Sequence, residues 1–509
     1  MAFSNYILFL YVIFRYFPFM IVPESDLAAV LRQMNPWWQG GLVPDLPDWK
    51  RAAFAELELW LREPPAHRAV LLAGARQIGK TTLFLQAIDG LIRRGVPPSN
   101  ILYLTFDHPL LKLAGLEAVL SVWRSLEVKA AGLEYLFVDE IQFVPAWQTW
   151  VKHCVDFQKD RRLALTGSAT PLSMEGQESG VGRWHTIRLS TLSFYEFLRI
   201  QGVTEPELPA VPSLARLFEW TPGDFSRTAT QAEPLVARFH DYLQRGGFPQ
   251  CALAPSVNWS QKLLREDIVD KVLKRDMTAL FGTRRIVELE HVFLYLCLHD
   301  GGLLDMQTLC RNLELRKPTV SNFIELLQAV HLIHKLSPFG YGKEVLRGRH
   351  KVYLADPALG PSVLSKGRAL LEDDVLLGQV VETALFKHLY TRLYAVNVTF
   401  SFWRGKRDHE VDLIADVQGR LVPFEVKYRG GDTGLSDVPG LREFCREKGV
   451  QRAYVVTRHL RDFGVLHDRE GGHDLSILKI PAPLACWWLG RSELDTVTRS
   501  LDAPSPLDP

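Results

Sequence analysis

The stretch from residue 69 to residue 88, AVLLAGARQIGKTTLFLQAI, decides the fold of the first half of the chain. Its apolar start, Ala69–Ala73, predicts a buried strand, and a helical pattern opens at Lys80. Between them lies the pattern G-x-x-x-x-G-K-T, which ends at Thr81. Glycines in this pattern let the backbone curl so that its N–H groups face phosphate oxygens, and the start of the helix adds positive potential.

This pattern predicts a site for ATP and Mg²⁺. Lys80 would reach the β- and γ-phosphates, and the hydroxyl of Thr81 would ligate the metal ion. The residues expected to bind the nucleotide are consecutive in the sequence: Gly74, Ala75, Arg76, Gln77, Ile78, Gly79, Lys80, Thr81 and Thr82.

A second motif, which is acidic, follows further along the chain. Residues 133–142 read LEYLFVDEIQ, in which the apolar run Tyr135–Val138 predicts a buried strand that ends at Asp139 and Glu140. Ligands of open α/β sheets bind beyond the carboxyl ends of the strands. We therefore expect Asp139 to bind Mg²⁺, directly or through water, and Glu140 to polarise the attacking water.

Three further polar residues are candidates for the ATP site, and two of them have an alternative interpretation. Ser168 follows the strand in LALTGSAT and either positions the lytic water beside the γ-phosphate or belongs to a plain turn. Arg183 either supplies a cation to the transition state across a subunit interface, which implies a homo-oligomer, or is an ordinary surface arginine. Arg245, in YLQRGGFPQ, is a weaker candidate for an arginine that contacts phosphate from a helical lid.

The fold class predicted by these patterns is α/β. Short apolar runs separated by helix-length segments are typical of a parallel sheet covered on both faces. The expected strands are Ala69–Ala73, Ile101–Phe106, Tyr135–Val138, Leu163–Thr166 and Thr186–Leu189. We expect a P-loop domain over residues 24–200, an insertion or linker over 201–235, a helical lid over 236–302, a winged helix over 303–357, a second α/β domain over 370–490 and a tail over 491–509.

The second α/β segment contains a predicted β-hairpin. Two amphipathic strands, Glu410–Asp416 and Leu421–Tyr428, flank the turn residues Gln418 and Gly419. A short turn with glycine between such strands favours antiparallel pairing.

This hairpin brings together residues with a second candidate chemistry. Glu425 and Lys427 are two positions apart and share one face of their strand, and in the predicted register Asp412 converges with them. Such carboxylates hold a Mg²⁺ ion that activates water for phosphodiester cleavage, while the lysine orients that water or stabilises charge. Glu382, on the preceding helix, would complete the ligand set. An exposed strand with alternating charges is the alternative.

The predicted winged helix consists of two helices followed by two strands with a glycine-rich basic loop between them. Its basic residues suit phosphate contacts that position a protein on DNA without reading its sequence. Use of the winged helix as a rigid protein-docking module is the alternative. The candidates for DNA contact are Arg316, Lys317, Lys343, Arg347 and Arg349.

Composition narrows the function classes. A net charge of +1 over 509 residues gives no overall basic excess, so any nucleic-acid surface must be local. The six cysteines are scattered and form no CxxC pair, which argues against a disulfide framework and a zinc knuckle. This pattern is the one expected for a protein of the reducing cytoplasm. The apolar run at 6–14 is too short to span a bilayer, so we expect no stable membrane insertion. Residues 1–23 are either a peripheral apolar tail or include a mis-assigned start ahead of Met20.

Taken together, the motifs resemble those of the AAA-type, archaeal-ATPase-like P-loop ATPases with a C-terminal winged helix and a PD-(D/E)XK restriction-endonuclease-like domain. The matching strings are NPWW, GARQIGKTT, FVDEIQ, TGS, YLQRGGFP and EVD…FEVK, and the resemblance covers nearly the whole chain. It implies an ATPase core, a helical lid and a nuclease-like module in which Asp412, Glu425 and Lys427 occupy the motif positions. The proline-rich stretch over 203–235 departs from this pattern.

Three functions are consistent with these observations. The first is an ATPase that acts on DNA, duplex or branched, as a motor or clamp with an attached metal-dependent nuclease module. The second is a nucleotide-gated signalling switch whose winged helix and nuclease-like fold dock partners and cleave nothing. The third is an effector nuclease that ATP binding licenses.

Overall fold

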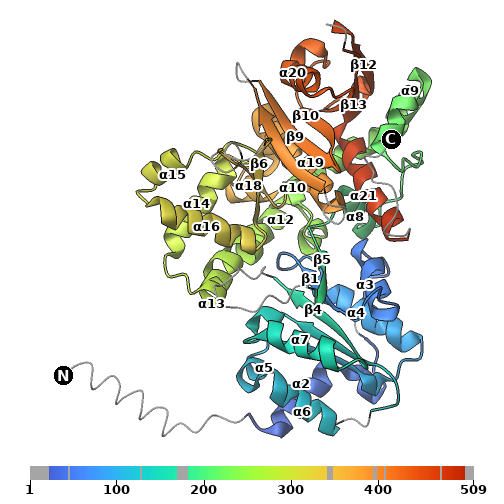
Figure 1. The fold of residues 1–509 in the computed structure, drawn as a ribbon, viewed down its shortest axis with the longest axis vertical. Coiled ribbons are helices and arrows are strands. Elements are labelled where there is room, and N and C mark those ends of the chain that lie inside the picture. The colour runs from blue at the N-terminus through green and yellow to red at the C-terminus, as the bar shows by residue number, and fades with distance from the viewer. Residues whose placement is uncertain are drawn as a thin grey trace, which may run out of the picture.

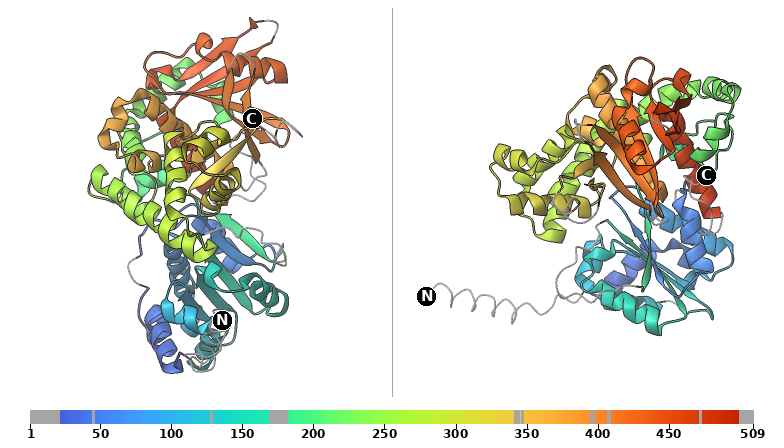
Figure 2. Two further views of the ribbon diagram at one scale, coloured as in Figure 1. Left: turned by 90° about the vertical axis from the view of Figure 1, so that its left-hand side faces the viewer. Right: turned by 45° about the horizontal axis from the view of Figure 1, so that its top comes forward.

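The computed structural model describes residues 22–43, 46–126, 129–168, 182–340, 345, 348–393, 398–405, 409–470 and 473–498. Two sheets lie one above the other along the long axis of the molecule (Figures 1 and 2). We call residues 22–189, which carry the first sheet, the P-loop domain, and residues 190–498, which carry the second, the C-terminal body.

The sheet of the P-loop domain has five parallel strands in the order β2-β3-β4-β1-β5. Every residue of the interior strand β1 is buried, as expected for a parallel sheet with helices on both faces. The five predicted strands are confirmed, although the last is displaced towards the N-terminus. The strands are β1 (Ala69–Ala73), β2 (Ile101–Thr105), β3 (Glu134–Asp139), β4 (Arg161–Gly167) and β5 (Trp184–Arg188).

Alternate residues of each strand face opposite helical layers because the side-chain period of a strand is two. Val70 and Leu72 belong to the core formed with α3 and α4, whereas Leu71 belongs to the core formed with α2, α5, α6 and α7. The helices are α2 (Glu24–Met34), α3 (Ala53–Arg62), α4 (Lys80–Arg93), α5 (Pro109–Ala114), α6 (Leu116–Leu126) and α7 (Trp147–Phe157).

The NPWW segment covers the edge strand β2. The side chain of Asn35 pairs with the backbone of Tyr103 through bonds of 2.9 Å to its carbonyl and 2.7 Å from its N–H. The indoles of Trp37 and Trp38 both donate to the carbonyl of Ile101. An edge strand otherwise leaves such groups unpaired, so this segment closes the sheet on that side.

The C-terminal body contains an eight-stranded mixed sheet in the order β12-β13-β11-β10-β9-β8-β6-β7. The predicted hairpin is confirmed, with β9 and β10 antiparallel around Gln418 and Gly419. Strand β6 pairs with β7 and also runs parallel to β8, through Ser337 and Pro338. The strands are β6 (Ile333–Pro338), β7 (Lys351–Leu354), β8 (Val398–Arg404), β9 (Glu410–Val417), β10 (Arg420–Lys427), β11 (Arg452–Thr457), β12 (Gly464–Asp468) and β13 (Leu475–Pro481).

Most helices of the C-terminal body precede or flank this sheet (Figure 1). Helices α15 and α16 precede the hairpin β6–β7 in the order expected for the winged helix, which itself stays a prediction. The helices are α8 (Phe194–Ile200), α9 (Pro222–Gln231), α10 (Glu233–Arg245), α11 (Pro249–Ala252), α12 (Val257–Leu263), the π-helix η5 (Leu264–Asp276), α13 (Met277–Phe281), α14 (Ile286–Leu298), α15 (Met306–Asn312), α16 (Lys317–Ala329), α18 (Leu359–Val363), α19 (Asp374–Leu393), α20 (Pro439–Lys448) and α21 (Ala482–Thr498).

The RGGFP string packs into a buried polar junction. The carboxylate of Asp356 accepts bonds from the hydroxyl of Thr191 at 2.6 Å and the N–H of Gly247 at 2.9 Å. The ammonium of Lys387 lies 3.5 Å from the same carboxylate. A Cβ atom at Gly247 would lie 2.4 Å from the carbonyl oxygen of Leu192, so this position has no room for a side chain.

The segment 201–235 is ordered and packs on the C-terminal body. Leu208, Leu214 and Phe225 are buried in the same core as Trp488, whose indole donates a 3.1 Å bond to the carbonyl of Pro209. The segment therefore contributes to this core, and its assignment as an insertion or linker stays a prediction.

The ends of the chain differ from the expected boundaries. Helix α21 continues to Thr498, past the expected domain end at residue 490. Residues 1–21 of the predicted N-terminal segment and 499–509 of the predicted tail lie outside the described residues. Within the described ranges, no helix has the length and apolarity needed to cross a bilayer.

Candidate nucleotide-hydrolysis site

The P-loop connects the end of β1 to the start of α4. A Cβ atom at Gly74 would lie 2.2 Å from the carbonyl oxygen of Leu189, so only glycine fits there. Gly79, with φ of 95°, adopts a left-handed conformation directly before α4. Gln77 also has a positive φ, of 59°. These turns curl the loop around the N-terminus of the helix, where phosphate is favoured.

Lys80 folds back onto the loop that precedes it. Its ammonium is buried and donates to the carbonyl oxygens of Gly74 at 2.8 Å and Ala75 at 2.7 Å. Burial lowers the pKa of Lys80, while Glu140 and Asp139 act in the opposite direction. An anionic phosphate oxygen is a stronger partner for an ammonium than a carbonyl, so it would displace these contacts.

Asp139 lies directly beside Thr81. The Thr81 hydroxyl donates a 2.7 Å bond to Oδ2 of Asp139, and the hydroxyl of Tyr103 donates to the same oxygen at 3.1 Å. Thr166 donates to the other oxygen. Burial, reinforced by Glu140, raises the pKa of Asp139. Hydroxyl and carboxylate oxygens are the donors that Mg²⁺ prefers, so Thr81 and Asp139 suit the predicted ion.

Glu140 is held by two neighbouring side chains. Its Oε2 accepts a 2.9 Å bond from the hydroxyl of Ser168, and Gln142 donates both to Glu140 and, at 2.8 Å, to Ser168. Its backbone N–H donates to the Thr166 hydroxyl at 2.9 Å, and its φ of 55° is left-handed. The structure therefore brings Ser168, which directly follows β4, to the predicted base.

Arg76 links the P-loop to the C-terminal body. Its Nε lies 2.8 Å from Oδ2 of Asp276, the last residue of η5, and its guanidinium lies 3.7 Å from Asp107. The side chains of Arg76 and Asp276 are 12% and 3% exposed. A second arginine, Arg51, donates to the carbonyl of Ile78 in the same loop at 2.9 Å. The loop thus contacts residues that precede it and residues that follow it in the chain.

The two other predicted arginines have partners within the chain. Arg183 forms a two-bond ion pair with Asp156 on α7, at 3.1 and 3.2 Å. A role for Arg183 in a neighbouring subunit stays a prediction. Arg245 is bound by Asp241 at 2.6 Å and by the carbonyl of Ala254 at 2.5 Å. These contacts place Arg245 in the helical packing of the C-terminal body, so its assignment as a phosphate-contacting lid arginine is not supported.

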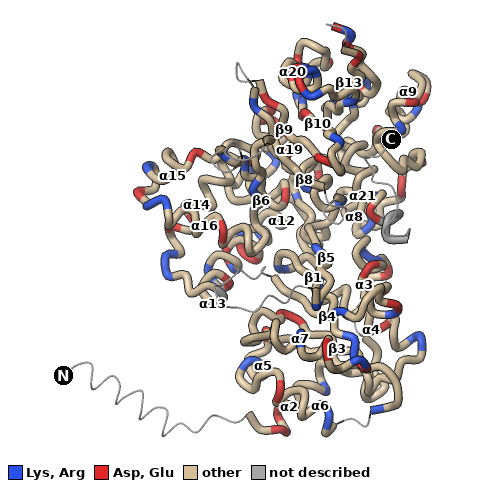
Figure 3. The backbone as a smooth tube through the Cα atoms, viewed as in Figure 1, with Lys and Arg blue, Asp and Glu red and all other residues tan. Residues whose placement is uncertain are grey.

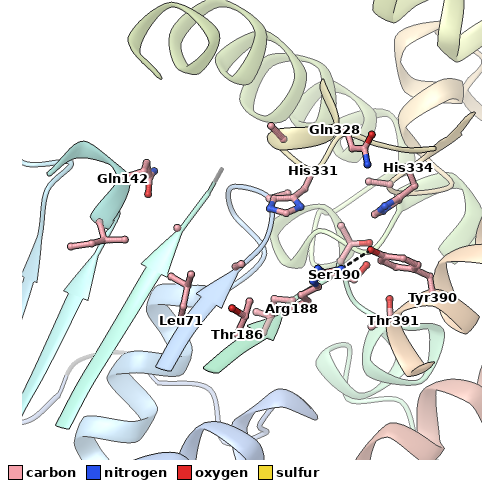
Figure 4. Close-up of a pocket in the computed structure, with 18 of the residues that line it drawn as sticks. Leu71, Gln142, Thr186, Arg188, Ser190, Gln328, His331, His334, Tyr390 and Thr391 are labelled. Atoms are coloured by element: carbon pink, nitrogen blue, oxygen red, sulfur yellow. Dashed lines mark hydrogen bonds between the residues drawn. The ribbon is translucent and has the colours of Figure 1, made fainter. Parts of the chain in front are cut away.

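A cavity of about 520 Å³ lies between the P-loop domain and the C-terminal body (Figure 4). Ala75 and Gln142 line it from the P-loop side, and His331 lines it from the segment that follows α16. Arg188, at the end of β5, donates a 3.0 Å bond to the Tyr390 hydroxyl on α19 across its floor. Lys80 and Thr81 do not line the cavity, so it adjoins the phosphate site without containing it.

The residues predicted for the second chemistry do meet in the C-terminal body. Lys427 donates a 2.7 Å bond to Glu425, and Oδ2 of Asp412 accepts the backbone N–H of Val426 at 2.9 Å. Glu382 also faces this cluster, but the ammonium of Lys351 lies between it and Asp412, 3.3 Å and 3.4 Å away.

Burial raises the pKa of two of these carboxyl groups. Burial, reinforced by Asp412, raises the pKa of Glu425 to about 8 and that of Glu382 to about 7. Among the described residues, no group of three or more His, Cys, Asp or Glu is arranged to hold a metal ion. The metal role of Glu382, Asp412 and Glu425 therefore stays a prediction that this arrangement does not support.

The predicted DNA contacts are only partly described. Arg316 and Lys317 are exposed at the start of α16, and Arg349 is 62% exposed and lies 3.8 Å from Asp305. Lys343 and Arg347 lie outside the described residues. Figure 3 shows acidic and basic residues interspersed over both bodies. The described surface thus offers a small basic site at α16.

Sequence reasoning missed four residues that the structure places at these sites. Gln142 stands two positions after Glu140 in the same motif, so its role had a sequence signal. The sequence signal for Tyr103 was weaker, because this residue was predicted only to lie on another strand of the same sheet. Asp276 and Lys351 had none, because each reaches its partners only through the packing of distant segments.

Comparisons with known proteins agree with this geometry. Residues 66–198 match a family model described as an AAA domain. The first domain is similar to AAA-type ATPases. Residues 236–369 and 377–478 match two domains of unknown function, DUF8612 and DUF4143. The AAA match and the parallel sheet give the first domain the fold of a P-loop NTPase and support a nucleotide-binding ATPase at the level of this domain family.

Relatives in two bacteria match about seven tenths of this chain. An uncharacterized protein of Haemophilus influenzae is 26% identical over 370 residues, which cover 70% of this chain and 82% of its own. One of Mycobacterium tuberculosis is 26% identical over 394 residues, 74% of each chain. The structure of AMPPCP-bound DnaA from Aquifex aeolicus aligns at 14% identity over 56% of this chain and 90% of its own, with a TM-score of 0.25, and this likeness carries no argument.

Proposed function

We propose that this protein hydrolyses ATP with Mg²⁺ and that the nucleotide controls the contact between the P-loop domain and the C-terminal body. The observation that carries the proposal is the connected set of bonds from Thr81 through Asp139 and Thr166 to Glu140. These bonds support Thr81 and Asp139 as a metal-binding pair and Glu140, directly after β3, as the base beside it.

Each side chain then has a defined task. Thr81 and Asp139 would hold Mg²⁺, which neutralises charge on the β- and γ-phosphate oxygens when bound. Lys80 exchanges its two carbonyl partners for phosphate oxygens. Glu140 orients the attacking water and accepts its proton, while Ser168 keeps the carboxylate of Glu140 in place.

Two substitutions test this assignment. In purified full-length protein, Lys80→Ala should lose both nucleotide retention and phosphate release. Glu140→Gln should retain ATP and lose turnover by about 100-fold or more, because it removes the base and leaves the phosphate contacts intact. Arg461→Ala, an exposed residue of the C-terminal body, serves as the control with full turnover. Equal turnover in wild type and Lys80→Ala would refute the proposal.

The control of domain contact is supported by Arg76. This residue is part of the loop expected to wrap the phosphates, yet it is ion-paired with Asp276 of the C-terminal body. The cavity beside it is bounded by both bodies, so the interface is incompletely packed next to the phosphate site. Phosphates that attract Arg76 would compete with Asp276 and loosen this contact.

A second candidate function is action on DNA. Its support is the exposed pair Arg316 and Lys317 at the start of α16, together with exposed Arg311 on α15, in a helix–turn–helix that precedes a hairpin. Such residues contact phosphates without reading bases. Duplex or four-way DNA should then stimulate ATP turnover.

Charge reversal separates this function from a protein-docking switch. Arg316→Glu combined with Lys317→Glu should abolish the DNA stimulation and leave basal turnover unchanged. Arg461→Glu combined with Arg469→Glu changes the net charge equally on exposed residues elsewhere. ATP turnover in the wild type that does not respond to any DNA would instead favour the nucleotide-gated switch.

A further inference from the structure

The ammonium of Lys351 lies among three carboxylates of the C-terminal body. Its Nζ is 2.5 Å from Oε1 of Glu410, 3.3 Å from Oε1 of Glu382 and 3.4 Å from Oδ1 of Asp412. Glu382 belongs to α19, Glu410 and Asp412 belong to β9, and Lys351 opens β7. The four side chains therefore join the hairpin β6–β7 to both a helix and a central strand.

The two-residue period of the strands explains this convergence. Glu410 and Asp412 share one face of β9, and Lys351 and Tyr353 share one face of β7. The hydroxyl of Tyr353 donates a 2.6 Å bond to the same Oε1 of Glu382 that faces Lys351. Strand β7 thus directs two donors at one carboxylate.

Burial makes this arrangement costly to break. The side chain of Lys351 is 3% exposed, whereas those of Glu382, Glu410 and Asp412 are 18%, 31% and 15% exposed. An ammonium that is removed from water needs nearby hydrogen-bond acceptors or anions to compensate for the lost hydration. The three carboxylates provide that environment for one cation.

Both oxygens of the predicted metal ligand Asp412 are already engaged. Asp412 faces Lys351 with Oδ1 and accepts the N–H of Val426 with Oδ2. Glu425, the remaining predicted ligand, accepts a bond from Lys427 with Oε1, while its buried Oε2 has no hydrogen-bond partner among the described residues. A divalent ion at the centre would stand next to an ammonium, and the two positive charges would repel each other at low dielectric.

We infer that Lys351 is the resident cation of this acidic cluster and takes the place of a divalent metal. The cluster is then a socket that fastens the hairpin β6–β7 to α19 and β9, and the second chemistry predicted from Glu382, Asp412 and Glu425 does not operate while the socket is filled. The inference is independent of ATP hydrolysis, because none of these residues lies at the P-loop.

A thermal melt with and without Mn²⁺ tests the inference. Lys351→Ala should melt several degrees below wild type, and Mn²⁺ should raise its melting temperature, because the ion fills the vacated position. Mn²⁺ should not raise that of the double variant Lys351→Ala/Asp412→Asn. Lys335→Ala, on the exposed side of β6, is the matched control and should melt like wild type. The melts are recorded without nucleotide, so that the P-loop contributes no metal complex.

Three outcomes would overturn the inference. Wild type that binds one Mn²⁺ more than Asp412→Asn would show a metal site that coexists with Lys351. Unchanged melting of Lys351→Ala would show that the ammonium fastens nothing. A destabilised Lys351→Ala without any Mn²⁺ rescue would show that the position does not suit a metal. Lys351→Met is a second variant in case Lys351→Ala does not fold. If neither folds, Mn²⁺ binding by wild type is compared with Mn²⁺ binding by Asp412→Asn. Equal binding by the two proteins supports the inference that Lys351 occupies the cluster.

Discussion

Arg76 and Asp276 form a buried ion pair, with Nε of the arginine 2.8 Å from Oδ2 of the aspartate. Arg76 stands in the middle of the P-loop, and Asp276 ends the π-helix η5 of the C-terminal body. The pair therefore connects the loop expected to hold phosphates with a segment far along the chain. Its energetics and its response to nucleotide can be measured separately.

Neutralising one member of this pair should destabilise the fold. Asp276→Asn leaves the Arg76 guanidinium buried beside only the more distant Asp107, and we expect a loss of about 3 kcal/mol in the free energy of unfolding. Urea unfolding measures this loss. The double variant Arg76→Met/Asp276→Asn should lose less than the sum of the single variants, and strict additivity would show that the two residues are not coupled. Glu219→Gln, in an exposed pair, is the control.

Nucleotide should loosen the same contact. In Glu140→Gln, which is expected to hold ATP without turnover, ATP should increase amide hydrogen exchange over residues 264–276 because the phosphates compete for Arg76. Adding Asp276→Asn to this variant should raise exchange before ATP arrives and remove the further increase. Identical exchange with and without ATP would contradict the proposed control of domain contact.

Ser168 should affect turnover without affecting binding. It holds the carboxylate of Glu140 with a 2.9 Å bond, so Ser168→Ala should lower kcat by about tenfold, with KM for ATP nearly unchanged. Steady-state phosphate release measures both constants. Ser125→Ala, which removes a hydroxyl on α6, is the control. An effect on KM alone would place Ser168 in nucleotide binding.

His388 should make stability depend on pH. Its Nε2 accepts the N–H of Phe194 at 2.8 Å and its Nδ1 donates to the carbonyl of Ala384 at 2.6 Å, which requires the neutral ring. Burial, reinforced by Lys387, lowers the pKa of His388 to about 3. The unfolded chain takes up a proton near pH 6.5, so the stability contributed by the neutral ring is lost as pH falls below that value, by about 2 kcal/mol at pH 5.

The variant His388→Gln isolates this contribution. Glutamine supplies an acceptor and a donor but does not titrate, so the difference in stability between wild type and variant should shrink as the pH falls from 7 to 5. Chemical denaturation at several pH values measures the difference. A constant difference would show that the ring is not held neutral.

Gly247 should tolerate no side chain. A Cβ atom there would lie 2.4 Å from the carbonyl oxygen of Leu192 and 2.8 Å from the ammonium of Lys387, so Gly247→Ala should cost about 2–3 kcal/mol. Gly223→Ala is the control, because its nearest neighbour would lie at 3.7 Å, an ordinary contact, and alanine favours the helix α9. Equal stability of both variants would contradict the tight packing of this junction.

Local sequence patterns predicted the P-loop domain well because its signals are short-range. The run Ala69–Ala73 is continuously apolar, and the glycines that follow it lie at positions where the loop turns or closely approaches other backbone. The hairpin around Gln418 and Gly419 was predictable for the same reason. The packing of the segment 201–235 was less predictable. Its polar composition resembles that of a linker, while its few apolar residues fill a core formed by other parts of the C-terminal body.

The sequence by itself determined the phosphate loop, the acidic strand end and the strands that carry them, because each depends on neighbouring residues and on strand or helix periodicity. Only the tertiary structure decided the partners of Arg76 and the presence of Lys351 among Glu382, Glu410 and Asp412. These contacts join segments that are distant in the chain, and the charge of an acidic cluster depends on which cation the fold brings to it.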